Sequence, residues 1–443
     1  MTRLLAAFYG DDFTGSAENL AQFHRHGLRC RLYFSVDGLV DIADTMANGL
    51  DVVGIAGTAR ALSPDDMTEE VEPAFALMQR LDPLVLQYKI CSTFDSSPRV
   101  GSLGRIMELA RRQWPGCSLP VFPATPAFGR YTAFATHFTR VNGDICRLDR
   151  NPAMANHPST PMHESDLRRH LAEQTDLQAG AVMLTDYQAG DGGRKRLQDE
   201  LDRGGFAILD AVDDSQVLHV ARLVASLSQT RPSVAIAAQG LADGLGRLWA
   251  ETNKDRSADS VQDSFPGVDR LLVLSGSCAP QTQGQLNAMA AAGATIIRLV
   301  PEAAVADPEL AAEEILDGVR SALTEGRDVA VATTRRSEEI TASLDGDGLA
   351  RAIGVVFARV ARAARVELGL QRIVFAGGDT SSYSMRQIGA DALEIAVFDQ
   401  QRSGHICRLI SSDPALDGLE VVLKGGQVAG DDFFLRAKAG TRG

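Results

Sequence analysis

Two adjacent carboxylates, Asp11 and Asp12, follow an apolar run of strand length and precede a segment with helical spacing. The apolar run, residues 4–9, is typical of a strand that is buried on both faces of a parallel sheet. Ligands of open α/β sheets gather beyond the carboxyl ends of the strands, where these carboxylates would lie. Two interpretations follow. Either the pair makes turn hydrogen bonds and complements the dipole of the next helix, or it acts as a catalytic carboxylate pair.

Two further strand ends carry polar side chains. Arg60 follows the strand-like run 51–56, and its planar guanidinium can bind both oxygens of a carboxylate, although a solvated surface arginine is the alternative. The run 84–90 leads into one cation, two hydroxyls and one carboxylate within seven positions. This set suits a polyhydroxylated acid, while a turn-rich loop is the alternative. Its members are Lys89, Ser92, Thr93 and Asp95.

The second half of the chain contains strand ends that are rich in glycine and serine. The run 271–274 ends at Ser275 and Ser277, and the run 373–376 ends at Gly377, Gly378, Asp379 and Thr380. A third run, 421–424, ends at Gly425 and Gly426. Glycines let the backbone approach a phosphate closely, and a following helix start favours negative charge. Neither glycine loop matches GxxxxGK[ST] or GxGxxG, so tight strand-to-helix turns remain the alternative.

Strands and helices alternate along most of the chain, which predicts an α/β protein with parallel, helix-covered sheets. The polar segment 251–267 ends in Pro-Gly and is the predicted linker between a domain of residues 1–250 and a domain of residues 268–443. Because Pro120 lies within the short run 119–122 and Pro123 follows it, we expect an edge strand or a strand end there. We expect residues 144–162 to be irregular.

Composition excludes several classes of protein. A length of 443 residues with 45% hydrophobic content suits packed globular domains, and a net charge of −13 argues against nucleic acid or anionic membrane as a partner. The 6 cysteines lack CxxC or zinc-like spacing, so we expect free thiols and a cytoplasmic location. We expect neither a signal peptide nor a membrane span. The spacing of His157, His163, Glu164 and His170 matches no metal-binding array, so we predict no metal site made from protein ligands alone.

Five segments together resemble the four-carbon acid sugar kinases, in the order and spacing of that family: GDDFTGS (10–16), YKICSTFDSS (88–97), LSGSCAPQT (274–282), AGGDTSS (376–382) and LKGGQVAGDDFF (423–434). The resemblance implies an N-terminal domain that binds the sugar acid, a C-terminal domain that binds ATP, and chemistry in the cleft between them. For the sugar acid it implies Asp11, Asp12, Arg60, Lys89, Ser92, Thr93 and Asp95. For the nucleotide it implies Ser275 or Ser277, residues 377–380 and Gly426.

The motif CSTFDS (91–96) resembles the corresponding loop of the family members that phosphorylate 3-oxo-tetronate, rather than that of the threonate and erythronate kinases. The chain departs from that branch at Gly10 and Asp379, and in the nucleotide loop at Gly425, Gln427, Val428 and Ala429. The segment 146–162 looks longer than its counterpart in that branch. A branched acid such as 3-oxo-isoapionate therefore remains an alternative substrate, as do threonate and erythronate.

Phosphoryl transfer requires an in-line hydroxyl and neutralised phosphates. Our hypothesis is that Asp12 accepts the proton of the terminal hydroxyl, that Asp11 orients this hydroxyl or the metal, and that Lys89 and Arg60 hold the carboxylate. Mg²⁺ would be bound mainly through phosphate oxygens and water. The expected partners are a sugar acid and ATP, and a homodimer is left open. A dehydrogenase and a non-catalytic sugar-acid sensor are the rival classes.

Overall fold

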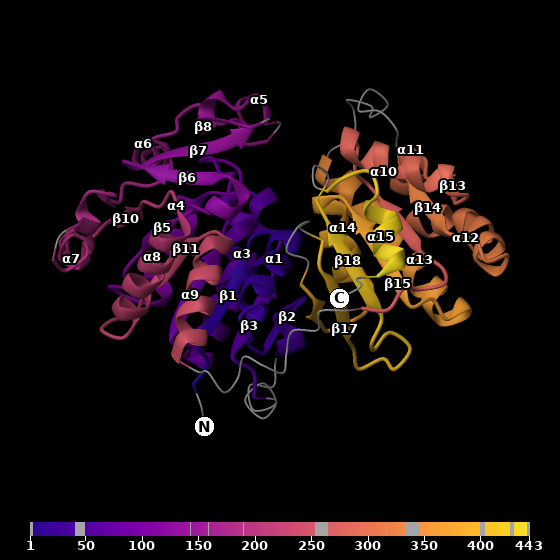
Figure 1. Cartoon of the computed structure of the whole chain (residues 1–443), viewed down its shortest axis with the longest axis horizontal. Helices are drawn as coiled ribbons and strands as arrows, with labels where there is room; N and C mark the ends of the chain where they lie inside the picture. Colours follow the sequence, from indigo (N-terminus) through magenta and orange to yellow (C-terminus); the bar gives the residue numbers. More distant parts are fainter. Residues whose placement is uncertain are drawn as a thin grey trace. The chain divides into compact units, whose positions relative to one another are not determined.

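A computed structural model describes residues 3–39, 49–141, 143–157, 159–188, 190–252, 265–333, 346–398, 404–425 and 429–440. The backbone divides into two compact units, which are coloured along the sequence in Figure 1. Unit 1 consists of Met1–Cys30 and Leu39–Ser260, and unit 2 consists of Arg31–Gly38 and Val261–Gly443. Each unit contains a mainly parallel sheet that is covered by helices, so the predicted α/β fold class is confirmed.

The sheet of unit 1 has the strand order β3-β1-β4-β11-β5-β10-β9, and every pairing in it is parallel. The residues of β1 are buried, as the sequence predicts for a strand covered on both faces. The short strand β5 lies inside the sheet, between β11 and β10, so the edge-strand alternative is wrong, whereas the other alternative holds because Pro120 begins the strand and Pro123 follows its end. Proline is tolerated there because Pro120 is the first residue of the strand. The strands are β1 (Ala6–Gly10), β3 (Val52–Ala56), β4 (Val85–Lys89), β5 (Pro120–Phe122), β9 (Ala179–Val182), β10 (Phe206–Leu209) and β11 (Val234–Ala237).

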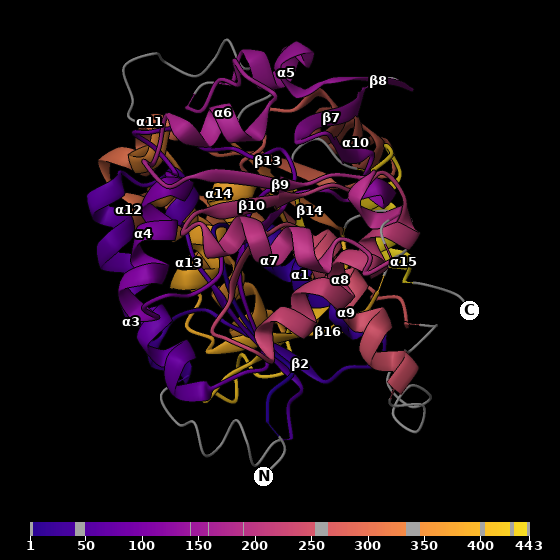
Figure 2. The same cartoon turned by 90° about the vertical axis from the view of Figure 1, so that its left-hand side faces the viewer.

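Helices cover both faces of this sheet. One group packs side by side and consists of α1 (Phe13–His24), α8 (Asp214–Ser228) and α9 (Gln239–Thr252), while α3 (Pro64–Leu81) packs on α4 (Leu103–Gln113) (Figures 1 and 2). A further helix, α7 (Arg194–Asp202), contacts β9 and β10. Side chains satisfy free N–H groups where four of these helices begin. The capping residues are Asp12 for α1, Ser63 for α3, Ser102 for α4 and Asp213 for α8.

Unit 1 also carries a small antiparallel sheet, β6 (Arg130–Ala133), β7 (Thr136–Val141) and β8 (Asp144–Arg147). The turn between β6 and β7 places Phe134 and Ala135 at φ 54° and 59°, a conformation that usually requires Gly or Asn. The buried carboxylate of Asp210 accepts their backbone N–H groups at 2.6 and 3.0 Å, which stabilises this turn. Two short helices follow, α5 (Pro152–Ala155) and α6 (Leu167–Ala172). The stretch 144–162, which we expected to be irregular, thus contains β8 and α5.

The sheet of unit 2 has the order β13-β14-β12-β15-β18-β17-β16-β2. Its first five strands are parallel and the others pair antiparallel. Its last strand comes from the N-terminal part of the chain: Leu32 pairs with Leu393, and Arg31 contacts Glu394 at 2.8 Å. The strands are β2 (Cys30–Tyr33), β12 (Leu272–Ser275), β13 (Thr295–Arg298), β14 (Val329–Ala332), β15 (Arg372–Ala376), β16 (Ala392–Val397), β17 (Ile406–Ile410) and β18 (Glu420–Lys424).

One group of helices in unit 2 packs together and consists of α11 (Pro301–Ala306), α12 (Pro308–Thr324), α13 (Gly346–Leu368) and α14 (Gly378–Gln387). The other face of the sheet forms an apolar core with α10 (Pro280–Ala291) and α15 (Phe433–Ala439). Most of the predicted linker 251–267 lies outside the described residues.

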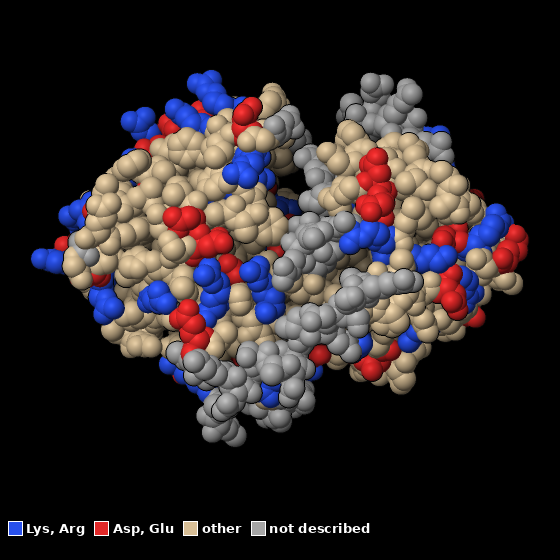
Figure 3. All heavy atoms as spheres, in the orientation of Figure 1, with Lys and Arg blue, Asp and Glu red and all other residues tan. Residues whose placement is uncertain are grey.

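The described surface has a mixed charge distribution. On the face shown in Figure 3, basic and acidic side chains are interspersed over each unit. Among the helices of the described residues, none is long and apolar enough to cross a membrane.

Candidate active site

The carboxyl end of β1 lies at a topological switch point of the unit 1 sheet. The chain passes from β1 to β3 on one side and later to β4 on the other, which is the arrangement that opens a ligand crevice in such sheets. Backbone hydrogen bonds join the three strand ends: Gly57 N donates to Gly10 O, Arg60 N to Asp11 O, and Asp11 N to Lys89 O. The predicted residues of segments 10–16, 57–60 and 89–95 are therefore held at one edge of one sheet.

Asp12 is bonded on several sides. Its carboxylate lies 2.7 Å from the guanidinium of Arg60 and 3.6 Å from Nζ of Lys89, and it accepts the N–H of Gly15 at 2.7 Å. Burial alone would raise the pKa of Asp12, but Arg60, Lys89 and this N–H lower it overall. Asp12 therefore stays ionised and positions the two cations.

Asp11 has the opposite character. Its side chain is 3% exposed, and burial raises its pKa to about 7 despite the nearby charges of Lys89 and Arg60. Oδ1 of Asp11 is buried and has no hydrogen-bond partner among the described residues. A carboxyl group with a free oxygen and a pKa near neutrality is suited to accept a proton from a ligand.

The loop after β4 is held in place by contacts with two buried histidines, His137 and His170. Buried His137 on β7 contacts the carbonyl of Ser92 at 2.9 Å, and burial lowers the pKa of this imidazole to about 4, which keeps it neutral. Phe94 is fully buried at φ 58°, an uncommon conformation for a bulky residue, and its ring packs on that of His170. The side of the loop that carries Asp95 is thereby held in a fixed position.

Further polar atoms of this loop region lack partners. Oδ1 of Asp95 and Oγ1 of Thr14 are buried and unbonded within the described part of the chain, as is Oδ1 of Asp11. Thr93 differs, because its hydroxyl already lies 2.8 Å from Sγ of Cys91. An unpaired buried polar group costs about 1–3 kcal/mol, so these atoms make the loop region a candidate binding site for a polar ligand.

In unit 2, the predicted nucleotide residues also gather at strand ends. Gly276 N donates to Ala376 O, and Gly377 N donates to Lys424 O, so the loops after β12, β15 and β18 are neighbours. Ser275 is 1% exposed, and its hydroxyl has no partner in the described structure. The hydroxyl of Ser277 instead accepts hydrogen bonds from Ala279 N and Thr282.

The loop after β15 is the candidate phosphate loop. Gly377 has φ 131°, and a side chain there would lie 2.6 Å from Thr380 Oγ1. Gly378 begins α14, and a Cβ on Gly378 or on Gly425 would meet no atom within 4 Å. The described residues thus leave room beside Gly378, and a helix start, whose first N–H groups have no partner within the helix, is a candidate position for a phosphate. The side chain of Asp379 and the whole of Gly426 lie outside the described residues.

The sequence analysis missed Lys424 as a site residue. It is fully buried at the end of β18, donates to Thr282 Oγ1 and Gly425 O, and has its pKa lowered to about 8 by burial. The signal was present, because Lys424 directly precedes a glycine pair at a strand end. Lys89 occupies a similar strand end in unit 1.

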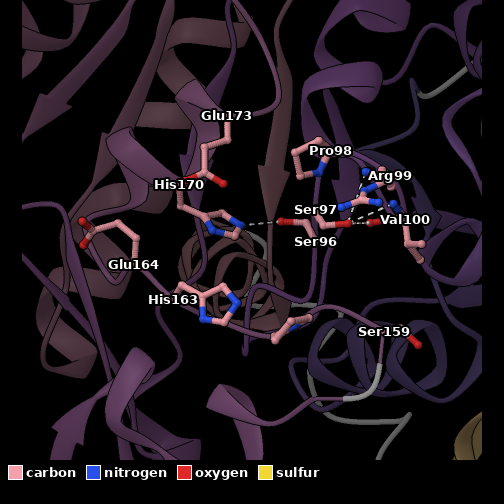
Figure 4. A pocket seen from close by; sticks show the side chains of 11 residues that line it. Ser96, Ser97, Pro98, Arg99, Val100, Ser159, His163, Glu164, His170 and Glu173 are labelled. Atoms are coloured by element: carbon pink, nitrogen blue, oxygen red, sulfur yellow. Dashed lines mark hydrogen bonds between the residues drawn. The ribbon is translucent and has the colours of Figure 1, made fainter.

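Three of the four residues considered for a metal-binding array line a cavity in unit 1. His163, Glu164 and His170 line a cavity of about 460 Å³, where His170 Nε2 lies 2.9 Å from Ser96 Oγ (Figure 4). Within the described residues, no group of three or more His, Cys, Asp or Glu side chains is arranged to hold a metal ion. The cavity lies behind the loop that carries Asp95.

The two units correspond to two known domain families. Residues 6–245 match the model of a sugar-binding N-terminal domain, and residues 272–434 match that of a nucleotide-binding C-terminal domain. The chain belongs to the four-carbon acid sugar kinase family. This confirms the family, and the kinase class that goes with it, as predicted from the five sequence segments.

Curated relatives in this family are similar to the chain over its full length. A 3-oxo-isoapionate kinase from Paraburkholderia graminis is 33% identical and is aligned over 99% of this chain and 94% of its own. A 3-oxo-tetronate kinase from Brucella melitensis is 27% identical over 97% of this chain and 94% of its own. Another from Pseudomonas savastanoi is 28% identical over 98% of this chain and 97% of its own.

Solved structures share the fold. A Salmonella typhimurium protein described as a putative tRNA synthase has a TM-score of 0.75 at 23% identity, with 98% of each chain covered. The Haemophilus influenzae protein HI1011 has a TM-score of 0.68 at 23% identity, with 97% of this chain and 98% of its own covered.

Gly15→Ala tests the geometry around Asp12. The added Cβ would lie 1.9 Å from Lys89 Nζ and 2.2 Å from Asp12 Oδ1, so both groups must move. We expect kcat/KM for the sugar acid to fall by roughly 10²-fold, the scale of an ångström-sized misplacement. Steady-state kinetics measures this, with Gly190→Ala as the control because its Cβ meets no atom within 4 Å. Wild-type kinetics in the Gly15 variant would show that the position of Lys89 is not required.

Proposed function

We propose that this protein transfers the γ-phosphate of ATP to the terminal hydroxyl of a 3-oxo sugar acid in carbohydrate-acid catabolism. One observation carries the proposal: buried Asp11, with a raised pKa and an unbonded oxygen, lies next to Arg60 and Lys89 within the sugar-binding domain. Such a site can accept a proton from a hydroxyl while cations balance an acidic substrate. A passive sensor does not require this carboxyl group, and a nicotinamide enzyme would need a dinucleotide loop such as GxGxxG, which neither glycine loop of unit 2 matches.

Two substrates of this type are candidates, 3-oxo-tetronate and the branched 3-oxo-isoapionate. The relative described as a 3-oxo-isoapionate kinase is 33% identical, whereas the relatives described as 3-oxo-tetronate kinases are 27–28% identical. This difference favours 3-oxo-isoapionate as the better substrate. The motif CSTFDS at residues 91–96 instead resembles the 3-oxo-tetronate kinases and favours 3-oxo-tetronate.

The two carboxylates have different roles in this proposal. Asp12 is bonded to Arg60, Lys89 and Gly15, so protonation of its carboxylate is unfavourable and it acts by positioning the cations. Asp11 has the free oxygen and the higher pKa, and is therefore the general base. These roles reverse those predicted from the sequence, in which Asp12 was the base.

ATP fits the loops of unit 2. Its phosphates would bind the N–H groups at the start of α14 and the hydroxyl of Ser275, with Gly378 and Gly425 leaving the space open. Mg²⁺ would be held mainly by phosphate oxygens and water, and neutralises phosphate charge when it is bound. The nucleotide and the acceptor hydroxyl must meet in line for transfer.

We place the reaction in the cytoplasm. All six cysteines are free, as in a reducing compartment. The proposed partners are a small sugar acid and ATP, and neither nucleic acid nor membrane has a role.

A substrate panel tests the proposed function. ATP turnover would be measured with 3-oxo-isoapionate, 3-oxo-tetronate, threonate and erythronate. We expect the 3-oxo acids to give the higher kcat/KM, with 3-oxo-isoapionate first. ADP release with none of the acids, despite binding of ATP, would favour a sensor.

Asp11→Asn tests the assignment of the base. We expect kcat to fall by roughly 10²-fold or more. In the wild type, kcat/KM should decline as the pH falls below about 7, because the pKa of Asp11 is raised from 3.8 to about 7 and protonation removes the base. Asp12→Asn is the comparison and should mainly raise KM for the acid. A wild-type kcat in the Asp11 variant would transfer the role to another group.

Asp11→Asn should also change how the free energy of unfolding depends on pH. Because the folded pKa of Asp11 exceeds its unfolded value, its contribution to stability is present at low pH and is lost as the pH rises from about 4 to 7. The advantage of Asp11→Asn over the wild type should therefore grow by about 3 kcal/mol between pH 5 and 8. Denaturant unfolding at both pH values measures this gain.

Gly378→Val tests the phosphate loop. Its Cβ would meet no protein atom within 4 Å, so we expect a folded variant whose side chain occupies the space for a phosphate. Loss of one or two charge-assisted hydrogen bonds, at about 1.5–3 kcal/mol each, predicts a rise of about tenfold to several-hundredfold in KM for ATP. Sugar-acid affinity without nucleotide should be unchanged. An unchanged KM for ATP would mean that the loop is only a turn.

A further inference from the structure

The small sheet of unit 1 has an inner face that is turned towards the loop after β4. Thr132 on β6 is paired with His137 on β7, and their side chains meet at 2.9 Å. His137 in turn contacts the carbonyl of Ser92, so this face of the sheet rests on the substrate loop. Both side chains are fully buried.

Strand periodicity places Arg130 on this same face. Arg130 is two residues before Thr132, and side chains two apart in a strand point to the same side. Its cross-strand partner is Thr139, which lies two residues after His137 and is also fully buried. Arg140, the next residue of β7, points to the opposite side and is exposed.

Polar atoms in this row lack partners. Nε of Arg130 and Oγ1 of Thr139 are buried and form no hydrogen bond with the described residues, and the same is true of Oγ1 of Thr125. Thr125 forms a β-bridge with Arg130 just beyond the carboxyl end of β5. Arg130 donates from Nη1 to the carbonyls of Phe128 and Gly129, which orients the guanidinium, while its buried Nε has no partner in the described residues.

The charge near Arg130 matches this placement. Burial lowers the pKa of Arg130, while Cys91 and Asp95 are close enough to raise it in part. Arg130 forms no ion pair among the described residues, whereas Arg60 and Lys89 both contact Asp12. Arg130 is therefore a cation near Asp95 that forms no direct ion pair with a described side chain.

We propose that Arg130 binds the carboxylate of the sugar acid, with the hydroxyls of Thr139 and Thr125 beside it. This inference rests on the proposed function. It leaves Arg60 and Lys89 to hold Asp12 and to lie near the reacting hydroxyl, instead of holding the carboxylate as the sequence analysis suggested. The acid group and the reacting end of the substrate would then contact different walls of the site: the small sheet and the end of β1.

Arg130→Gln and Arg130→Lys, compared with wild type, test this assignment. Calorimetry without nucleotide would use 3-oxo-isoapionate and 3-oxo-tetronate, each beside its uncharged carboxamide. In the wild type we expect the acid to bind at least tenfold more tightly than the amide. Arg130→Gln should bring this ratio close to one, and Arg130→Lys should give an intermediate ratio because it keeps the charge without the planar fork. Arg140→Gln is the control from the opposite face of the same hairpin and should keep the wild-type ratio.

The outcomes separate this proposal from the proposed function. A wild-type ratio in Arg130→Gln, together with ATP turnover by the wild type, would overturn the role of Arg130 and return the carboxylate to Arg60 and Lys89. A wild-type protein that binds neither the acids nor the amides would contradict the substrate class, and this inference with it. Thermal melting of each variant shows whether a lost ratio reflects unfolding. A folded Arg130→Lys that binds the acid and the amide as the wild type does would also count against the proposal.

Discussion

The ion pairs of Asp12 with Arg60 and Lys89 are the interaction on which the site in unit 1 depends. They join the ends of three neighbouring strands, and the same carboxylate caps α1 through the N–H of Gly15. Lys89 is 2% exposed, and a buried cation requires a partner. Because Lys89 passes directly over Gly15, a residue without a side chain is needed at that helix position. The motif GDDFTGS is therefore explained by packing as well as by chemistry.

With Asp12 committed to structure, the unsatisfied groups around it become available for function. Asp11, Asp95, Arg130 and Thr139 each keep a buried polar atom without a partner in the described residues. A fold selected for stability alone would bond or replace such atoms, since each costs free energy. Asp11 and Asp95 follow β1 and β4, while Arg130 and Thr139 belong to the small sheet, and a substrate with polar groups at both ends would pair with both sets.

The two units differ in two ways from a simple succession of two domains along the sequence. Residues 31–38 follow α1 of unit 1 but supply the last strand of the unit 2 sheet, through pairing of β2 with β16. The small sheet is inserted into unit 1 between β5 and β9 and supports the loop after β4 through His137. Because of the first feature, the sheet of unit 2 includes a segment from the N-terminal part of the chain. Because of the second, the position of Ser92 depends on His137, 45 residues later in the chain.

The sequence by itself determined the α/β class and the strand ends that carry the candidate site, because buried parallel strands are continuous apolar runs and their ends are marked by Asp, Lys and Gly. Its five motif segments also determined the family. It did not reveal β6 and β7, since Phe134 and Ala135 form their turn in place of Asn-Gly, and the buried Asp210 that stabilises the turn lies about 75 residues away. It also could not distinguish Asp11 from Asp12. These are adjacent, identical residues, and only the tertiary structure decides which one is bonded to Arg60 and Lys89 and which is left buried with a free oxygen.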